Sequence, residues 1–140
     1  MDADRIEAML GEDRAVWDLL RDELDARPAQ PVYDDGLNWT SADVYSHLAR
    51  WMDRSMDVFE ARLEGQALPD LSGSDDEINA GWHAEDHGSG LDEARLGAQH
   101  AFDRRLHLLE SVPPRDWDDE LERIARADGS DHYADHRHFA

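Results

Sequence analysis

The sequence predicts an all-α fold: a four-helix bundle in which residues 1–140 form one domain. Three observations predict it. Apolar residues recur at steps of three and four over long stretches, strand-like alternation is missing, and the sequence has no internal repeat. We expect helices near 3–26, 41–64, 91–112 and 130–139, with a long crossover between the second and third helices and a short final helix.

The first predicted helix ends before Pro28 and Pro31. Asp13 interrupts its apolar stripe. This carboxylate is expected either to pair with an arginine or contact water at the bundle end, or to orient a ligand histidine. The apolar members of the stripe are Ile6, Leu10, Trp17, Leu20 and Leu24.

The second predicted helix begins at Thr40 or Ser41 as N-cap, has Asp43 in its first turn, and ends at Gly65. His47 lies beside its apolar stripe and is expected to border the interior. The stripe itself consists of Val44, Leu48, Trp51, Met52, Phe59 and Leu63.

The crossover at 65–90 is the least regular part of the chain. A short acidic helix is possible from Asp75 to Asp86. His83 and His87 form one of two HxxxH pairs, but the glycine-flanked segment has little apolar support. We therefore expect it to be mobile and do not expect these two histidines to be metal ligands.

The third predicted helix, 91–112, ends at Pro113 and Pro114. His100 and His107 project almost opposite its apolar face and are expected on the surface. Asp116 is expected to cap a short helix that follows. The apolar face of the long helix consists of Leu91, Ala94, Ala98, Ala101, Phe102, Leu108, Leu109 and Val112.

The final helix is expected to begin at Asp128-Gly129-Ser130 and to carry the other HxxxH pair, His132 and His136. This spacing puts both imidazoles on one helix face, ~5–6 Å apart. Tyr133 is expected at the edge of that face, which Phe139 and Ala140 share. The polar side consists of Asp131, Asp135 and His138.

The composition excludes several kinds of chemistry and partner. The chain has no cysteine and no lysine, which excludes thiolate nucleophiles, disulfides and Schiff bases. The net charge of -20 disfavours nucleic acid and anionic membranes as partners, and is typical of high-salt cytoplasm or of GC-rich genomes. With no apolar run long enough for a bilayer and no signal-peptide pattern, we expect a cytoplasmic protein.

The segment from Trp39 to Trp51, with His47-Leu48 just before the second tryptophan, resembles the second-helix signature of the DinB-like (damage-inducible B) four-helix bundle superfamily. Further motifs resemble its ClbS/DfsB branch: Gly65, Leu68-Pro69, Ile78-Asn79 and Asp131-His132-Tyr133-Ala134-Asp135-His136. The resemblance covers residues 39–138. The chain ends four residues after His136, so its last helix is expected to be shorter than is usual in the family.

The resemblance implies a metal triad of His47, His132 and His136. Three imidazoles leave open positions at the metal, as in catalytic sites, and accept zinc, nickel or iron. Tyr133 or Asp13 would handle protons or orient a ligand. A substrate pocket would be lined by Trp51, Trp82 and Asn79.

Family members imply two activities. Some resemble transferases and maleylpyruvate isomerase-like enzymes that use a low-molecular-weight thiol, and the ClbS branch is linked to self-protection against the electrophile colibactin. We therefore expect a metal-dependent hydrolase or thiol transferase that detoxifies a small electrophile. The alternative is a non-catalytic bundle that binds a small molecule or dimerises without a metal. A homodimer is also expected because a short fourth helix would leave apolar surface uncovered.

Overall fold

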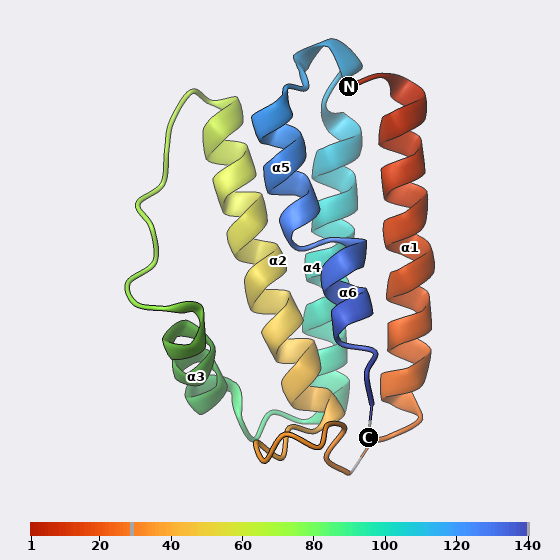
Figure 1. Ribbon diagram of the computed structural model, residues 1–140, viewed down its shortest axis with the longest axis vertical. Coiled ribbons are helices and arrows are strands. Elements are labelled where there is room, and N and C mark those ends of the chain that lie inside the picture. Colours follow the sequence, from red (N-terminus) through yellow and green to blue (C-terminus); the bar gives the residue numbers. More distant parts are fainter. Residues whose placement is uncertain (29, 140) are drawn as a thin grey trace.

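The computed structural model describes residues 1–28 and 30–139, and these are helical or loop throughout, with no strand (Figure 1). The prediction of an all-α bundle is thus confirmed. Its helices are α1 (Ala3–Asp25), α2 (Ser41–Leu63), α3 (Asp75–Asp86), α4 (Leu91–Ser111), α5 (Asp119–Ala127) and α6 (Ser130–Asp135), with a 3-10 turn at Pro114–Asp116. Among the described residues, no helix has both the length and the apolar character required to cross a bilayer.

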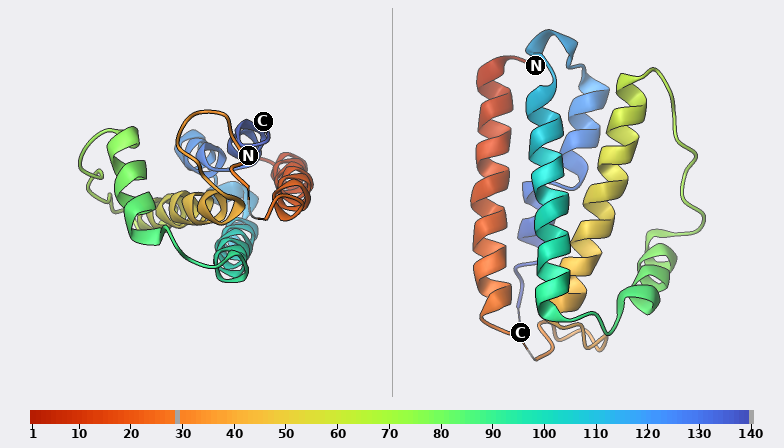
Figure 2. Two further views of the ribbon diagram at one scale, coloured as in Figure 1. Left: turned by 90° about the horizontal axis from the view of Figure 1, so that it is seen from below. Right: turned by 180° about the vertical axis from the view of Figure 1, so that it is seen from behind.

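Three long helices, α1, α2 and α4, extend along the bundle, and α5 and α6 together fill its fourth position (Figures 1 and 2). The crossover returns the chain to the end of the bundle where α2 begins. As a result, α2 and α4 run parallel as neighbours. Helix α3 lies outside the bundle, beside the first half of α2.

Local sequence explains most helix ends. Thr40, one of the two predicted N-cap residues, forms a capping box with Asp43, whose carboxylate accepts hydrogen bonds from the Thr40 backbone N–H and hydroxyl. The expectation that Asp116 caps the next helix is wrong: Asp116 belongs to the 3-10 turn after Pro113. Asp118 caps α5 instead, because its Oδ1 accepts the N–H of Leu121 at 2.8 Å.

A buried polar layer divides the hydrophobic core. It consists of Asp13, Ser55, Arg105 and Asp128, which are at most 9% exposed. Toward the N-terminal end of α1, Ile6, Leu10, Phe59, Leu109 and Trp117 belong to one apolar cluster. The cluster on the other side includes Trp17, Leu20, Leu48, Phe102 and Tyr133.

The final helix is shorter than predicted, since α6 ends at Asp135 and not near residue 139. Six residues cannot sustain an isolated helix, so tertiary contacts hold it. Tyr133, expected at the edge of the inward face, is instead fully buried, and its hydroxyl donates to the Met52 sulfur at 3.2 Å. Beyond the helix, Arg137 pairs with Glu23 of α1 at 2.6 Å. Ala140 lies outside the described residues.

The packing also covers the apolar surface on which the expectation of a dimer depended. The surface that a short last helix would leave open is covered by α5, which buries Leu121, Ile124 and Ala125. Leu63, expected on the core stripe of α2, is instead 41% exposed. The homodimer itself stays a prediction.

Candidate metal centre

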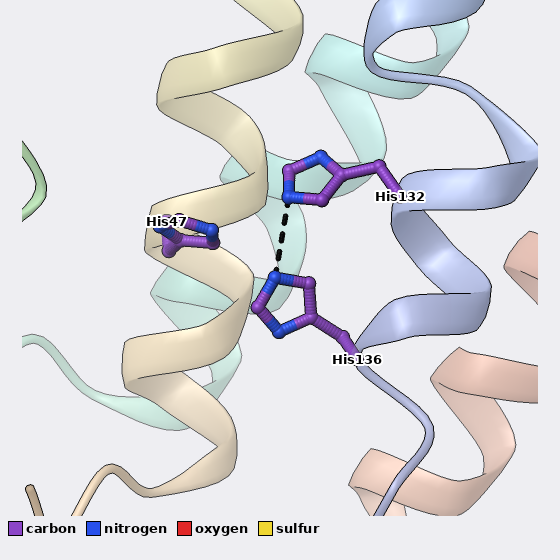
Figure 3. Close-up of side chains that lie close together, drawn as sticks. All are labelled: His47, His132 and His136. Atoms are coloured by element: carbon purple, nitrogen blue, oxygen red, sulfur yellow. Dashed lines mark hydrogen bonds between the residues drawn. The ribbon is translucent and has the colours of Figure 1, made fainter. Parts of the chain in front are cut away.

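The structure brings together the three histidines that the sequence singled out. His47 extends from the middle of the first half of α2, whereas His132 and His136 lie in and just after α6 (Figure 3). One ring nitrogen of each lies within 4.8 Å of those of the other two. The ring centroid of His47 is 5.4 Å from that of His132 and 4.8 Å from that of His136.

The two histidines of α6 have the separation of metal ligands. Their Nε2 atoms are 3.2 Å apart and face one another (Figure 3). Two nitrogens bound ~2.0–2.1 Å from a tetrahedral zinc are ~3.3 Å apart. A single ion can therefore contact both nitrogens with little movement of the rings.

Tyr33, from the loop between α1 and α2, fixes the orientation of His136. Its hydroxyl donates its single hydrogen to the His136 carbonyl oxygen at 2.7 Å. The contact of 3.0 Å between the Tyr33 oxygen and His136 Nδ1 must then be one in which Nδ1–H donates. This tautomer leaves the Nε2 lone pair directed at His132.

Asp128 has the corresponding position beside His132. Its Oδ1 is 3.2 Å from His132 Nδ1, although the angle falls short of a hydrogen bond and this buried nitrogen has no hydrogen-bond partner among the described residues. The negative charge favours a proton on Nδ1, which again leaves Nε2 free. The other Asp128 oxygen accepts a hydrogen bond from Ser55 of α2. Carboxylate and hydroxyl groups commonly support metal-ligating histidines in this way.

Burial keeps the imidazoles of His47 and His136 neutral. Burial, together with the neighbouring His136 and His132, lowers the pKa of His47 to about 3. Burial likewise lowers the pKa of His136 to about 4, assisted by His132. Only a neutral imidazole has a lone pair for a metal ion, so this environment suits metal binding near neutral pH.

The two residues expected to act on protons have other partners. Asp13 is 2% exposed and accepts a hydrogen bond at 2.7 Å from Arg105, which is completely buried. The other Asp13 oxygen accepts the Ser130 backbone N–H at 2.9 Å, so Asp13 caps α6 from a distant helix. Burial raises the pKa of Tyr133 well above its ordinary value. Both residues position α6; neither is placed to exchange protons with a substrate.

Gly129 makes this arrangement possible. A Cβ at this position would lie 2.6 Å from Arg105 Nη2 and 2.8 Å from Asp13 Oδ1. The chain can therefore pass over the buried ion pair and turn into α6 only where the residue has no side chain.

An open groove of about 640 Å³ lies over the three histidines. Trp51 and Asn79, two of the expected pocket residues, line it, and the Trp51 indole donates to the Asn79 side chain at 2.7 Å. The third, Trp82, packs against Trp51 but lines a separate small pocket beside Asp43. Acidic residues surround the groove: Asp35, Asp75, Asp128, Asp131 and Asp135.

Four of the five remaining histidines form two pairs, and the fifth, His138, is exposed near the C-terminus. His100 and His107 are exposed on α4, as predicted. His83 and His87 are not isolated in a loop, because α3 forms from Asp75 to Asp86 and His87 follows it directly. Both histidines lie close to Asp43 of α2.

Sequence reasoning missed the supporting residues Tyr33, Asp128 and Arg105. A signal existed for Arg105, because it interrupts the apolar stripe between Phe102 and Leu109 as Asp13 interrupts its own. Two opposite charges on two buried stripes predict an ion pair. Tyr33 lies in an irregular loop, where no periodic pattern could indicate its contact.

Comparison of the chain with models of known families, with characterised proteins and with solved structures found no match in any of the three. The DinB-like resemblance therefore stays a prediction from the motif residues. The chemistry of the site has to be derived from its geometry.

Proposed function

We propose that the protein binds one divalent transition-metal ion through His47, His132 and His136 and uses it to act on a small electrophilic molecule. The reaction would be hydrolysis or the transfer of a small thiol. The observation that carries the proposal is the pair of Nε2 atoms of His132 and His136, 3.2 Å apart, with both Nδ1 atoms beside partners that favour protons there.

Two imidazole lone pairs that face each other repel unless something lies between them. A proton shared between the two Nε2 atoms would relieve the repulsion, but it would require one ring to give up its favoured tautomer or to become charged. Burial opposes a charged ring, as the lowered pKa of His136 indicates. A metal ion relieves the repulsion and leaves both tautomers in place.

The set of ligands suits zinc, nickel or iron, because all three accept imidazole. Three protein ligands would leave room for a water or substrate, the arrangement of catalytic and not of structural zinc sites. A bound ion would act there as a Lewis acid that lowers the pKa of a water or thiol, or polarises a carbonyl. Since the chain has no cysteine, any thiol has to come from a cosubstrate.

The groove restricts the substrate. Its volume of about 640 Å³ is within the usual range for small-molecule sites, ~300–1,000 Å³. Tyr33, Trp39 and Trp51 supply aromatic surface, whereas the carboxylates around it repel anions. We therefore expect a neutral or cationic small molecule with an apolar part.

These aromatic walls also favour one alternative, a protein that sequesters the same molecule without chemistry. Turnover separates the two functions. The metal-loaded protein would be incubated with model epoxides and activated esters, with and without a small thiol. Product formation that requires the metal supports the enzyme, while saturable binding of these molecules without product formation supports sequestration.

Metal binding itself is tested first. The protein would be purified without a nickel column, stripped with a chelator and titrated with zinc while its melting temperature is followed. Zinc should raise the melting temperature of the wild-type protein, because it binds only the folded state at this centre. His47→Ala, His132→Ala and His136→Ala should each lose most of this rise.

The matched control is His100→Ala, an exposed histidine of α4 that should leave the rise unchanged. If the single substitutions in the triad bind zinc as tightly as the control does, the three histidines are not the metal site.

A further inference from the structure

A second group of potential ligands lies one helical turn away from the first. Asp43 precedes His47 by four residues on α2. Its carboxylate lies close to His83 and His87, which are in and just after the neighbouring α3. One ligand atom of each lies within 4.8 Å of the others. Two histidines spaced four residues apart again face a residue of α2.

Hydrogen bonding does not explain why all three side chains lie together. Asp43 Oδ1 is 3.2 Å from His87 Nδ1 and 3.6 Å from His83 Nδ1. Only the shorter of these distances is a hydrogen bond. Two imidazole nitrogens therefore converge on one carboxylate oxygen that satisfies only one of them.

We propose that Asp43, His83 and His87 form a second site for a divalent transition-metal ion, one that joins α3 to α2. Two imidazole nitrogens and one carboxylate oxygen are a ligand set that zinc and iron both accept. This site does not require an ion at the His47 centre.

The surrounding contacts leave one oxygen of the Asp43 carboxylate available to bind an ion. Its Oδ2 is engaged with Thr40 in the capping box, while Oδ1 faces the histidines. The nearby carboxylates of Glu85 and Asp86 are paired with Arg50 at 2.8 and 2.9 Å. Asp43 is therefore the local carboxylate without an arginine partner among the described residues, and it is only 6% exposed.

Helix α3 is the α-helix of the described residues that has the weakest hold on the bundle. None of its described residues is buried. Polar and aromatic contacts hold it to α2: the Trp51–Asn79 hydrogen bond, the Trp51–Trp82 edge contact and the Arg50 ion pairs. An ion shared between Asp43 and the two histidines would add a cross-link at the C-terminal end of α3.

The cross-link would also affect the groove over the first site. Asp75 and Asn79 of α3 line this groove. Trp39 lies between the two groups, with its ring centroid 5.2 Å from that of His47 and 5.1 Å from that of His83, on which it stacks. An ion at the second site would thus fix one wall of the groove.

The site is tested by counting zinc ions with isothermal titration and native mass spectrometry on metal-stripped protein. We expect two ions per chain for the wild-type protein, with weaker binding at the second site because His87 is 64% exposed. His132→Ala should retain only the second ion. His87→Ala and His83→Ala should retain the first ion and bind the second at least ~100-fold more weakly, since loss of a mere supporting residue costs ~10–100-fold.

Hydrogen exchange then reports on the tether. In His132→Ala, zinc should slow amide exchange across α3, and adding His87→Ala should abolish that effect. His107→Ala, which removes an exposed histidine of α4, serves as the control for both measurements. A second ion that persists undiminished in His83→Ala and His87→Ala would overturn the proposal, as would a wild-type protein that binds a single ion lost with His132→Ala.

Discussion

The protein contains two HxxxH pairs that face the same helix, and they differ in what lies behind them. His132 and His136 are backed by Tyr33, Asp128 and a buried ion pair. His83 and His87 lie in and just after a helix with no buried side chain; His83 stacks on Trp39, whereas His87 is exposed. The same spacing thus gives a supported, half-buried pair in one place and, in the other, a less supported pair of which His87 is exposed.

The difference shows that the motif supplies potential ligands, whereas the tertiary structure decides how firmly their side chains are held. A metal ligand holds its geometry when its second nitrogen and its backbone are fixed by neighbours. We therefore expect the first centre to lose affinity when distant supports are removed, and the second to be insensitive to the same changes.

The largest effect should come from the ion pair beneath α6. Asp13→Ala leaves Arg105 charged and without a partner in the core, and removes the group that caps α6 at Ser130. Breaking such a buried pair costs about 3–5 kcal/mol of unfolding free energy. Urea denaturation measures the loss. Zinc binding at the His47 centre should weaken as well, because α6 carries two of its ligands.

Asp92→Ala is the control for this experiment, since Asp92 is 98% exposed and should change stability by no more than ~0.5 kcal/mol. A change of similar size for the two substitutions would show that the buried pair does not support the fold.

Gly129→Ala should have the next largest effect. The added Cβ would collide with Arg105 and Asp13 and displace the start of α6, at a cost of ~1–3 kcal/mol. Zinc affinity should fall at the His47 centre and stay unchanged at Asp43, His83 and His87. Calorimetric titration measures both.

The matched control is Gly97→Ala in the exposed interior of α4, where a Cβ meets nothing within 4 Å. It should raise stability by ~0.5–1 kcal/mol, because alanine favours a helix. Equal loss of stability in both variants would rule out the close approach at Gly129.

Tyr33→Phe removes a single hydroxyl and should have a smaller effect on stability. The His136 ring loses the partner of its Nδ1 atom, so zinc affinity at the first centre should fall ~10–100-fold. Competition with a zinc chelator measures the zinc affinities of the variant and the wild-type protein. Tyr45→Phe is the control, because the Tyr45 hydroxyl bonds Asp25 at 2.6 Å instead of a histidine. Unchanged affinity in Tyr33→Phe would mean that the hydroxyl does not orient His136.

The smallest effect is expected from pH in the metal-free protein. His47 and His136 have folded-state pKa values of about 3 and about 4, below the ordinary 6.5. The unfolded chain therefore binds protons that the folded chain does not, and stability should fall as pH drops below ~6.5 toward these values. Melting temperatures between pH 6.5 and 5 would measure the slope while most carboxylates are still ionised.

The double variant His47→Gln/His136→Gln should show a flatter slope over the same range, since neither replacement titrates. Identical slopes for the double variant and the wild-type protein would contradict the burial of neutral imidazoles. A wild-type protein saturated with zinc should show a steeper fall, because protons also compete with the metal.

Helical periodicity was enough to predict α1, α2 and α4 to within a few residues, because each buries a continuous stripe. It failed at α6, which was predicted to continue to residue 139 but ends at Asp135. A six-residue helix is set by contacts with α1 and α2 and not by its own propensity. The odd charge at Asp13 was visible in the sequence, but its partner Arg105 was overlooked.

The sequence by itself determined the all-α class, the position of each long helix and the histidine types available as ligands. The tertiary structure decided which of these potential ligands meet. His47 and Asp43 extend from neighbouring turns of α2, and only the packing of α6 on one side and α3 on the other assigns a different HxxxH pair to each. Spacing along one helix fixes which side chains share a face, whereas a contact such as that of His47 with His136, 89 residues apart, depends on how the core packs.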